Sequence, residues 1–212
     1  MKELNTYIDH TILNADAKME DVKKIVDEAE EYKFYSVCVN SSFVKPVREY
    51  NKNVRIAAVV GFPLGAMASK AKAFEAKTAI EDGASEIDMV LEIGRLKEGS
   101  YDYVRDDIKM VKKAIGENIL KVIIETSLLT DEEKIMACKL SEEAGADFVK
   151  TSTGFSTGGA KLADVALMKK TVGDRLKVKA SGGIHTKDQA LALIKAGADR
   201  IGASKSIAIC KE

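Results

Sequence analysis

The stretch Gly-Ala-Asp-Phe-Val-Lys at residues 145–150 joins a glycine to a short apolar segment that ends in a lysine. Two other stretches have the same form: Gly-Ala-Ser-Glu-Ile-Asp at 83–88 and Gly-Ala-Asp-Arg-Ile-Gly at 197–202. Glycine is favoured directly after a helix, because it adopts the left-handed backbone that closes the last turn. Each stretch therefore predicts the passage from a helix into a strand. Asp88, Lys150 and Gly202 occupy equivalent positions in these strands.

Outward from these repeats, apolar and charged segments alternate along the chain. The apolar, β-branched segments predict eight strands, at Tyr7–Thr11, Ser36–Val39, Arg55–Val60, Glu86–Leu91, Lys121–Glu125, Phe148–Thr151, Lys177–Ala180 and Arg200–Gly202. The charged segments with helical spacing predict helices at Met19–Lys33, Ser42–Asn51, Ser69–Asp82, Tyr101–Ile115, Asp131–Ala144, Leu162–Val172 and Lys187–Ala196. Strands that alternate with helices form βαβ units and a parallel sheet. Eight similar units predict an α/β fold, a single (β/α)8 TIM barrel over residues 1–212.

Composition limits the classes of partner. Of the 212 residues, 46% are apolar, which is enough for a sizeable core in one domain. Lysine plus arginine total 33 and aspartate plus glutamate total 33, a balance that argues against a nucleic-acid partner. Residues 1–14 have no long apolar stretch of the signal-peptide kind, and no run approaches the ~18 apolar residues of a membrane span. We therefore expect a cytoplasmic protein with no membrane partner.

The cysteines and histidines are isolated from one another. Cys38, Cys138 and Cys210 form no Cys-x-x-Cys pair, which predicts free thiols in a reducing compartment. The two histidines, His10 and His185, lie far apart in the chain. These isolated residues offer few ligands for a His/Cys metal site, so we expect no metal.

Three of the predicted strands contain ionisable residues where parallel strands are normally apolar. These residues are Glu86 and Asp88 in one strand, Lys150 in another, and Lys177 and Lys179 in a third. Lysine and aspartate are rarely buried unless they are paired. Each could pair with a surface acid or reach solvent. Their concentration in three strands of one barrel favours the alternative, a cluster of one acid and two amines at the barrel mouth, where active sites of this fold lie.

Such a cluster predicts amine chemistry. A lysine has a pKa of ~10.4 and is protonated at neutral pH, but burial or a neighbouring cation favours the neutral amine. If Lys150 and Lys179 lie together, one of them can attack a carbonyl and form a Schiff base. The resulting iminium accepts electrons when an adjacent carbon–carbon bond breaks. Asp88 would hold the second lysine charged and relay protons.

Glycine-rich segments follow the last three predicted strands, at residues 154–159, 181–184 and 202–204. Barrel enzymes often bind phosphate with the loops after strands seven and eight, because glycine lets backbone N–H groups approach an anion closely. The predicted phosphate-binding residues are Gly154, Gly182, Gly183, Gly202 and Ser204. The alternative interpretation is a set of ordinary tight turns. The chain contains no Walker A or Gly-x-Gly-x-x-Gly signature, which argues against a nucleotide cofactor.

Several segments together resemble one known family. They are Ile8–Thr11, Val37–Asn40, Val60–Gly65, Glu86–Val90, Phe148–Phe155 and Lys177–Ile184. In this order and over most of the chain, they are similar to the deoxyribose-phosphate aldolases. The resemblance implies a class I aldolase without metal or cofactor, which reversibly cleaves 2-deoxy-D-ribose 5-phosphate into D-glyceraldehyde 3-phosphate and acetaldehyde in deoxyribose phosphate catabolism. It also implies small-molecule partners only, and a possible homodimer.

The resemblance also implies roles for individual residues. Lys150 matches the Schiff-base lysine, Lys179 the second lysine that tunes it, and Asp88 the acid of the proton relay. Asp9 and Thr11 match positions that hold sugar hydroxyls. The five predicted phosphate-binding residues, Gly154, Gly182, Gly183, Gly202 and Ser204, match phosphate-contacting positions.

Some residues depart from the family pattern. Lys205 stands where a small residue usually follows Ser204, and it could contact phosphate or point to solvent. His185 replaces an expected arginine, and Ser127 a frequent cysteine. Two rival functions stay open: a Schiff-base aldolase for another phosphosugar, and a non-catalytic barrel that binds sugar phosphates.

Overall fold

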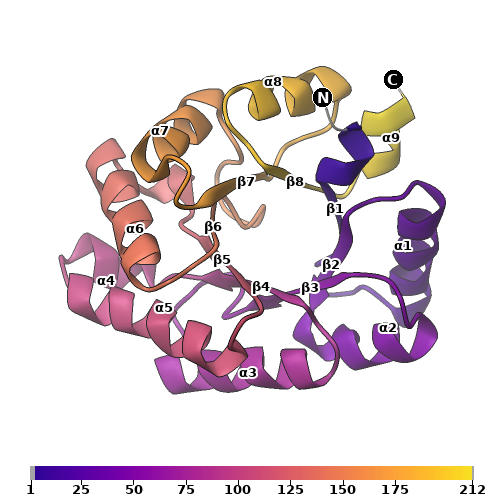
Figure 1. Cartoon of the computed structure of the whole chain (residues 1–212), viewed down its shortest axis with the longest axis horizontal. Helices are drawn as coiled ribbons and strands as arrows, with labels where there is room; N and C mark the ends of the chain where they lie inside the picture. Colours follow the sequence, from indigo (N-terminus) through magenta and orange to yellow (C-terminus); the bar gives the residue numbers. More distant parts are fainter. Residues whose placement is uncertain (1–2, 212) are drawn as a thin grey trace.

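The chain folds into a closed barrel of eight parallel strands, each hydrogen-bonded to the next, with the last bonded to the first (Figure 1). This computed structural model describes residues 3–211. The strands are β1 (Ile8–Thr11), β2 (Ser36–Asn40), β3 (Ile56–Val60), β4 (Glu86–Val90), β5 (Ile119–Ile123), β6 (Phe148–Lys150), β7 (Lys177–Ser181) and β8 (Arg200–Ala203). The predicted (β/α)8 barrel is therefore confirmed.

Helices form a ring outside the strands (Figure 1). They are α1 (Met19–Glu31), α2 (Val44–Tyr50), α3 (Ser69–Glu81), α4 (Ile93–Lys97), α5 (Tyr101–Ile115), α6 (Asp131–Glu143), α7 (Leu162–Val172), α8 (Lys187–Lys195) and α9 (Ser206–Lys211). Short 3-10 helices lie at η1 (Leu4–Tyr7), η2 (Ser41–Phe43) and η3 (Thr126–Leu128). Over residues 3–211, none of the helices has the length and apolar character needed to cross a bilayer.

The core lies mainly between the strands and this ring of helices. In α5, Val104, Ile108, Val111 and Ile115 recur at helical spacing, and all four side chains are buried. Every residue of β3 is buried as well, as expected for a strand covered on both faces. The shell is thus mainly apolar, whereas the inside of the barrel carries the network of charged residues described below.

The predicted helix boundaries are largely confirmed. The side-chain oxygen of Thr130 accepts a hydrogen bond from Glu133 N at 3.3 Å, and Thr186 accepts one from Gln189 N at 3.3 Å, so both capping boxes form. The glycines that begin the three repeats have φ values of 114° at Gly83, 83° at Gly145 and 116° at Gly197. These are left-handed backbones that a side chain would strain.

The structure corrects several boundaries. β5 begins two residues earlier than predicted, and it also ends two residues earlier. It stops before Glu125 because the backbone of that residue is left-handed and not extended. Tyr7 belongs to η1 and not to the first strand. The short helices α4 and α9 were not predicted, since five or six residues give little periodicity to detect.

Candidate active site

Seven ionisable side chains form one connected network inside the barrel. They come from six strands, β1 and β4 to β8: Asp9, Glu86, Asp88, Lys121, Lys150, Lys179 and Arg200. All are at most 5% exposed. The strand register explains why they meet, since Asp88 is paired with Lys121 across β4 and β5, and Lys150 with Lys179 across β6 and β7.

Asp88 lies at the centre of this network. Its Oδ1 is 2.7 Å from Lys121 Nζ. Its Oδ2 is 2.9 Å from Lys150 Nζ and 2.8 Å from Lys179 Nζ. The two lysines predicted to work together therefore share one carboxylate oxygen, and the predicted cluster of one acid and two amines is present.

Two further carboxylates complete the network. Asp9 bridges Lys179 at 2.5 Å and Arg200 at 2.9 Å. Glu86 bridges Lys121 at 2.5 Å and Arg200 at 3.2 Å. Lys121, Lys179 and Arg200 thus each contact two carboxylates, and each carboxylate contacts two of these three cations.

Lys150 is the basic residue of this network that has no carboxylate oxygen to itself. The network holds four basic groups against three carboxylates, and Lys150 contacts only Asp88, through an oxygen that Lys179 also uses. A buried charge without a full partner is strongly disfavoured, and such a group loses its charge instead. Lys150 is therefore the basic group of this network whose charge is least compensated.

The pKa shifts of Lys150 and Lys179 agree with this balance of charges. Burial lowers the pKa of Lys150, and the nearby Lys179 ammonium lowers it further against the opposing effect of Asp88. Burial also acts on Lys179, but Asp88 and Asp9 outweigh it and raise the pKa of Lys179. The arrangement can present a neutral amine beside a permanent ammonium ion, which is the condition for Schiff-base formation.

The pKa of the Asp88 carboxyl lies well below its usual range. Burial raises this pKa, but Lys121, Lys150 and Lys179 together reverse the effect. Asp88 is therefore a carboxylate at neutral pH. It can accept a proton from either lysine only transiently.

The third repeat, at residues 197–202, has a glycine where the other two repeats have a charged residue. Gly202 occupies the β8 position equivalent to Asp88 and Lys150, and a Cβ there would lie 3.0 Å from Lys179 Cε. That distance is tighter than ordinary van der Waals contact. A bare backbone at residue 202 is therefore required for the Lys179 side chain to cross the barrel.

A cavity of about 470 Å³ opens above the network at the carboxyl ends of the strands. Among the residues that line it are Thr11, Lys150, Gly154, Gly182, Gly183, Gly202 and Ser204. The structure thus brings all five predicted phosphate-binding residues into one cavity with Lys150. His185 also lines this cavity. Asp9, Asp88 and Lys179 do not line it, and all three are fully buried beneath it.

The glycine loops at the rim pack directly against one another. A Cβ on Gly159 would lie 2.2 Å from Gly182 O, so no side chain fits at residue 159. Ala160 N donates to the carbonyl oxygens of Ser181 and Gly182 at 3.1 and 3.0 Å. These glycines are therefore required by close backbone packing as well as by any ligand.

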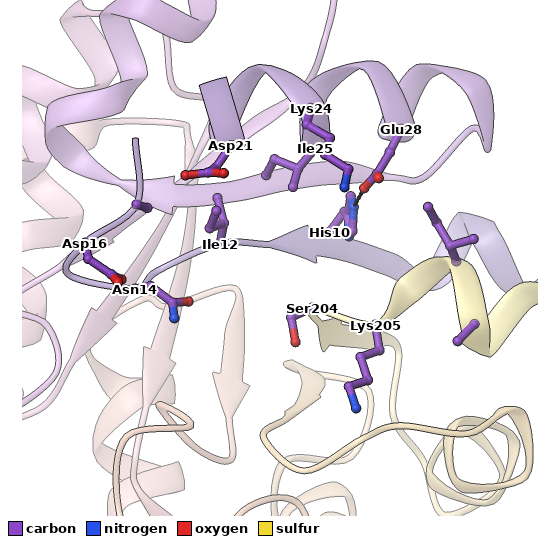
Figure 2. Close-up of a pocket in the computed structure, with 13 residues that line it drawn as sticks. His10, Ile12, Asn14, Asp16, Asp21, Lys24, Ile25, Glu28, Ser204 and Lys205 are labelled. Carbon is purple, nitrogen blue, oxygen red and sulfur yellow. Dashed lines mark hydrogen bonds and ion pairs between the residues drawn. The ribbon is translucent and has the colours of Figure 1, made fainter. Parts of the chain in front are cut away.

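A second cavity lies outside the barrel, between α1 and the start of α9 (Figure 2). His10 crosses its floor, with Nε2 2.7 Å from Glu28 Oε2 and Nδ1 2.9 Å from Ser206 Oγ. Figure 2 shows Ser204 and Lys205 extending away from the His10–Glu28 pair. Ser204 lines both cavities, whereas Lys205 lines only the outer one and is exposed.

Three charged residues of this region were missed in the sequence. Lys121 and Arg200 are ionisable residues in parallel strands that should be apolar. The same pattern identified Lys150. Glu125 closed the predicted strand Lys121–Glu125 but lies beyond β5, and the direction of its side chain depends on a backbone irregularity that the strand pattern does not encode. Lys177, which shares a strand with Lys179, is exposed at the opposite end of β7 and takes no part.

Cys38 belongs to the core and not to the cavity. It packs in a buried cluster with Leu13, Ala57 and Val59, and burial raises the pKa of its thiol. Within residues 3–211, no group of three or more His, Cys, Asp or Glu side chains is arranged to hold a metal ion.

Comparisons with known proteins agree with this geometry. The model of the DeoC/LacD family of aldolases matches residues 4–211. The chain is 64% identical over 98% of its length to the deoxyribose-phosphate aldolase of Finegoldia magna (98% of that protein), and 58% identical over 98% to that of Enterococcus faecalis (96% of that protein). The tetrameric deoxyribose phosphate aldolase of Aeropyrum pernix superposes with a TM-score of 0.88 at 34% identity, covering 98% of this chain and 89% of its own. The chain therefore belongs to the DeoC/LacD family of aldolases.

Proposed function

We propose that the protein is a class I aldolase that reversibly cleaves 2-deoxy-D-ribose 5-phosphate into D-glyceraldehyde 3-phosphate and acetaldehyde. The observation that carries the proposal is the surplus lysine of the buried network. Among the four basic residues of this network, Lys150 alone has no carboxylate oxygen to itself, and it lines a cavity whose far rim is built from glycine loops. The names of the relatives support this choice of substrate, and the geometry of the network supports Lys150 as the nucleophile.

The reaction begins at Lys150. Its neutral amine attacks the C1 aldehyde of the open-chain sugar phosphate, and loss of water from the carbinolamine gives a protonated iminium. The pKa of Lys179 is raised, so its ammonium persists through this step. Asp88 links the two nitrogens through one oxygen, which gives protons a short path between them.

Cleavage then uses the iminium as an electron sink. Removal of the C3 hydroxyl proton breaks the C2–C3 bond, and its electron pair forms the enamine while D-glyceraldehyde 3-phosphate leaves. The enamine is protonated at C2, with Lys179 and Asp88 acting as the relay, directly or through water. Hydrolysis of the new iminium releases acetaldehyde and restores the Lys150 amine.

The rest of the cavity orients the substrate. Gly154, Gly182, Gly183, Gly202 and Ser204 form the phosphate end of the proposed site. Thr11 lines the cavity and is placed to bond a sugar hydroxyl. Asp9 has both oxygens bonded to cations, so a hydroxyl contact by Asp9 requires one of these bonds to open when substrate enters.

Borohydride trapping tests the proposal. The protein is incubated with 2-deoxyribose 5-phosphate, reduced, digested and mapped by mass spectrometry. We expect the reduced adduct on Lys150. An adduct on Lys179 would reverse the two lysine roles, and active protein without any adduct would refute the Schiff-base mechanism. A panel of other phosphosugars, assayed in parallel, tests the choice of substrate.

Two broader features belong to the proposal. We place the enzyme in a reducing cytoplasm, in keeping with three free cysteines, and expect it to form a homodimer. Exposed apolar side chains such as Leu64 and Phe74, 75% and 72% exposed, offer area for a contact between copies. Light scattering of the purified protein decides the assembly, and a monomer at micromolar concentration would contradict it.

A further inference from the structure

Glu125 combines three unfavourable features directly beside the proposed site. Its backbone is left-handed, with φ 53° and ψ 67°, a conformation that favours glycine. Its side chain is only 2% exposed. Within residues 3–211 its Oε1 has no hydrogen-bond partner. Strained residues persist where the surrounding structure compensates for them, and they concentrate at functional sites.

The backbone at Glu125 forms a bulge between the ends of β5 and β6. Ile124 N donates to Lys150 O at 3.0 Å, and Thr126 N donates to Thr151 O at 2.9 Å. In a regular parallel ladder, donors two residues apart reach acceptors two residues apart. Here the acceptors are consecutive, so Glu125 is an extra residue. Bulges of this kind redirect a side chain.

The redirected carboxylate reaches the segment that follows Lys150. Glu125 Oε2 accepts a hydrogen bond from Thr153 N at 3.1 Å and contacts the Thr153 hydroxyl closely. Thr153 Oγ1 in turn accepts one from Phe155 N at 3.0 Å. Glu125 therefore fixes the two residues on either side of Gly154.

Gly154 is the point where this support meets the phosphate end of the cavity. A Cβ on Gly182 would lie 3.5 Å from Gly154 Cα, so the loops after β6 and β7 touch here. The far end of the β6 loop is held separately, by the packing of Gly159 against Gly182. At the near end of this loop, Glu125 holds Thr153, while Ser181 Oγ donates to Ser152 O and Phe155 packs against Phe62.

We propose that Glu125 is a positioning residue that sets the preference for phosphorylated substrates by holding Thr153 and Gly154 at the phosphate end of the cavity. This inference rests on the proposed function for its substrate. Glu125 does not line the cavity, so it acts through the loop and not by touching substrate.

The test compares three variants with the wild type. Glu125→Gly removes the carboxylate and relieves the backbone strain, whereas Glu125→Gln keeps an oxygen that accepts from Thr153 N. Lys33→Gly is the matched control, because Lys33 also has φ 53° but lies at the end of α1, away from the cavity. For each protein, kcat and KM are measured with 2-deoxyribose 5-phosphate and with unphosphorylated 2-deoxyribose, together with thermal stability.

We expect Glu125→Gly to lower kcat/KM for the phosphorylated sugar about tenfold, mainly through KM, a loss typical of a displaced binding loop. The unphosphorylated sugar should lose less than about threefold, and Glu125→Gln should recover most of the preference. Lys33→Gly should match the wild type with both sugars. Equal losses with both sugars in Glu125→Gly, or no loss with either, would overturn the proposal.

Inorganic phosphate separates this inference from the proposed reaction. Its binding to the same four proteins is measured by calorimetry, which needs no turnover. Weaker phosphate binding in Glu125→Gly alone would support the positioning role even if the wild type failed to cleave 2-deoxyribose 5-phosphate. Unchanged phosphate binding in that variant would refute the role even in an active aldolase.

Discussion

Two buried ionic sites of this protein, one in the shell of helices and one inside the barrel, differ in their balance of charge. In the shell, between α3 and α5, Lys72 and Asp107 form an ion pair with Nζ and Oδ2 2.8 Å apart and both side chains fully buried. Inside the barrel, Lys150 is nearly as buried, at 3% exposed, but shares its only carboxylate with Lys179. The two sites therefore differ little in burial and clearly in the balance of charge.

The balance decides which site can do chemistry. In the shell, one basic group faces one carboxylate, and Lys72 Nζ also donates a hydrogen bond to Val90 O at 3.1 Å. Four basic groups against three carboxylates leave Lys150 with a surplus charge in a medium that solvates charge poorly. Under the proposed mechanism, the reactivity of Lys150 comes from this local excess of cations, and burial alone would not produce it.

Removal of Lys150 gives the largest expected effect. Lys150→Met should lower kcat by roughly 10³-fold or more, because the nucleophile is gone. The same change leaves three cations against three carboxylates, so the free energy of unfolding should be unchanged or raised. Steady-state kinetics and chemical denaturation measure the two quantities. Substantial turnover, or a marked loss of stability, would contradict the charge count.

Removal of Lys72 should give the reverse result. Lys72→Met leaves Asp107 buried without its partner, which typically costs about 3–5 kcal/mol of stability. Turnover of the folded fraction should stay near that of the wild type. The double variant Lys72→Met/Asp107→Leu should recover most of the loss, since a balanced pair can be replaced by apolar side chains. A strong loss of kcat in the folded double variant would show that the two sites are coupled.

The comparison also shows what could be predicted from sequence. The barrel and the pairing of Lys150 with Lys179 follow from ionisable residues in strands that should be apolar, together with the glycine repeat. Lys121 and Arg200 carried the same signal but were not recognised, although the charge count depends on them. Glu125 was out of reach, because its orientation depends on a bulge that composition and periodicity do not encode.

The effect of Lys179 on Lys150 should appear in the pH dependence of Schiff-base formation. Burial and the Lys179 ammonium lower the pKa of Lys150, so the rate of borohydride trapping should rise with pH and reach its midpoint below the ~10.4 of a free lysine. Lys179→Met removes a cation and leaves Asp9 and Asp88 less compensated. Both changes favour protonated Lys150, so the midpoint should move up by about one unit. An unchanged or lowered midpoint would show that Lys179 does not tune Lys150.

The smallest effect is expected from a cation at the solvent-exposed rim. Lys205 follows Ser204 and lies exposed in the outer cavity, and no ion pair to it occurs within residues 3–211 (Figure 2). Water and salt screen a charge in this position, so it resembles neither buried site. Lys205→Ser should raise KM for 2-deoxyribose 5-phosphate by roughly threefold at low salt, and less at high salt. Unphosphorylated 2-deoxyribose should be unaffected. If KM for the phosphorylated sugar is the same in both proteins at every salt concentration, Lys205 only faces solvent and the glycine loops bind the phosphate without it.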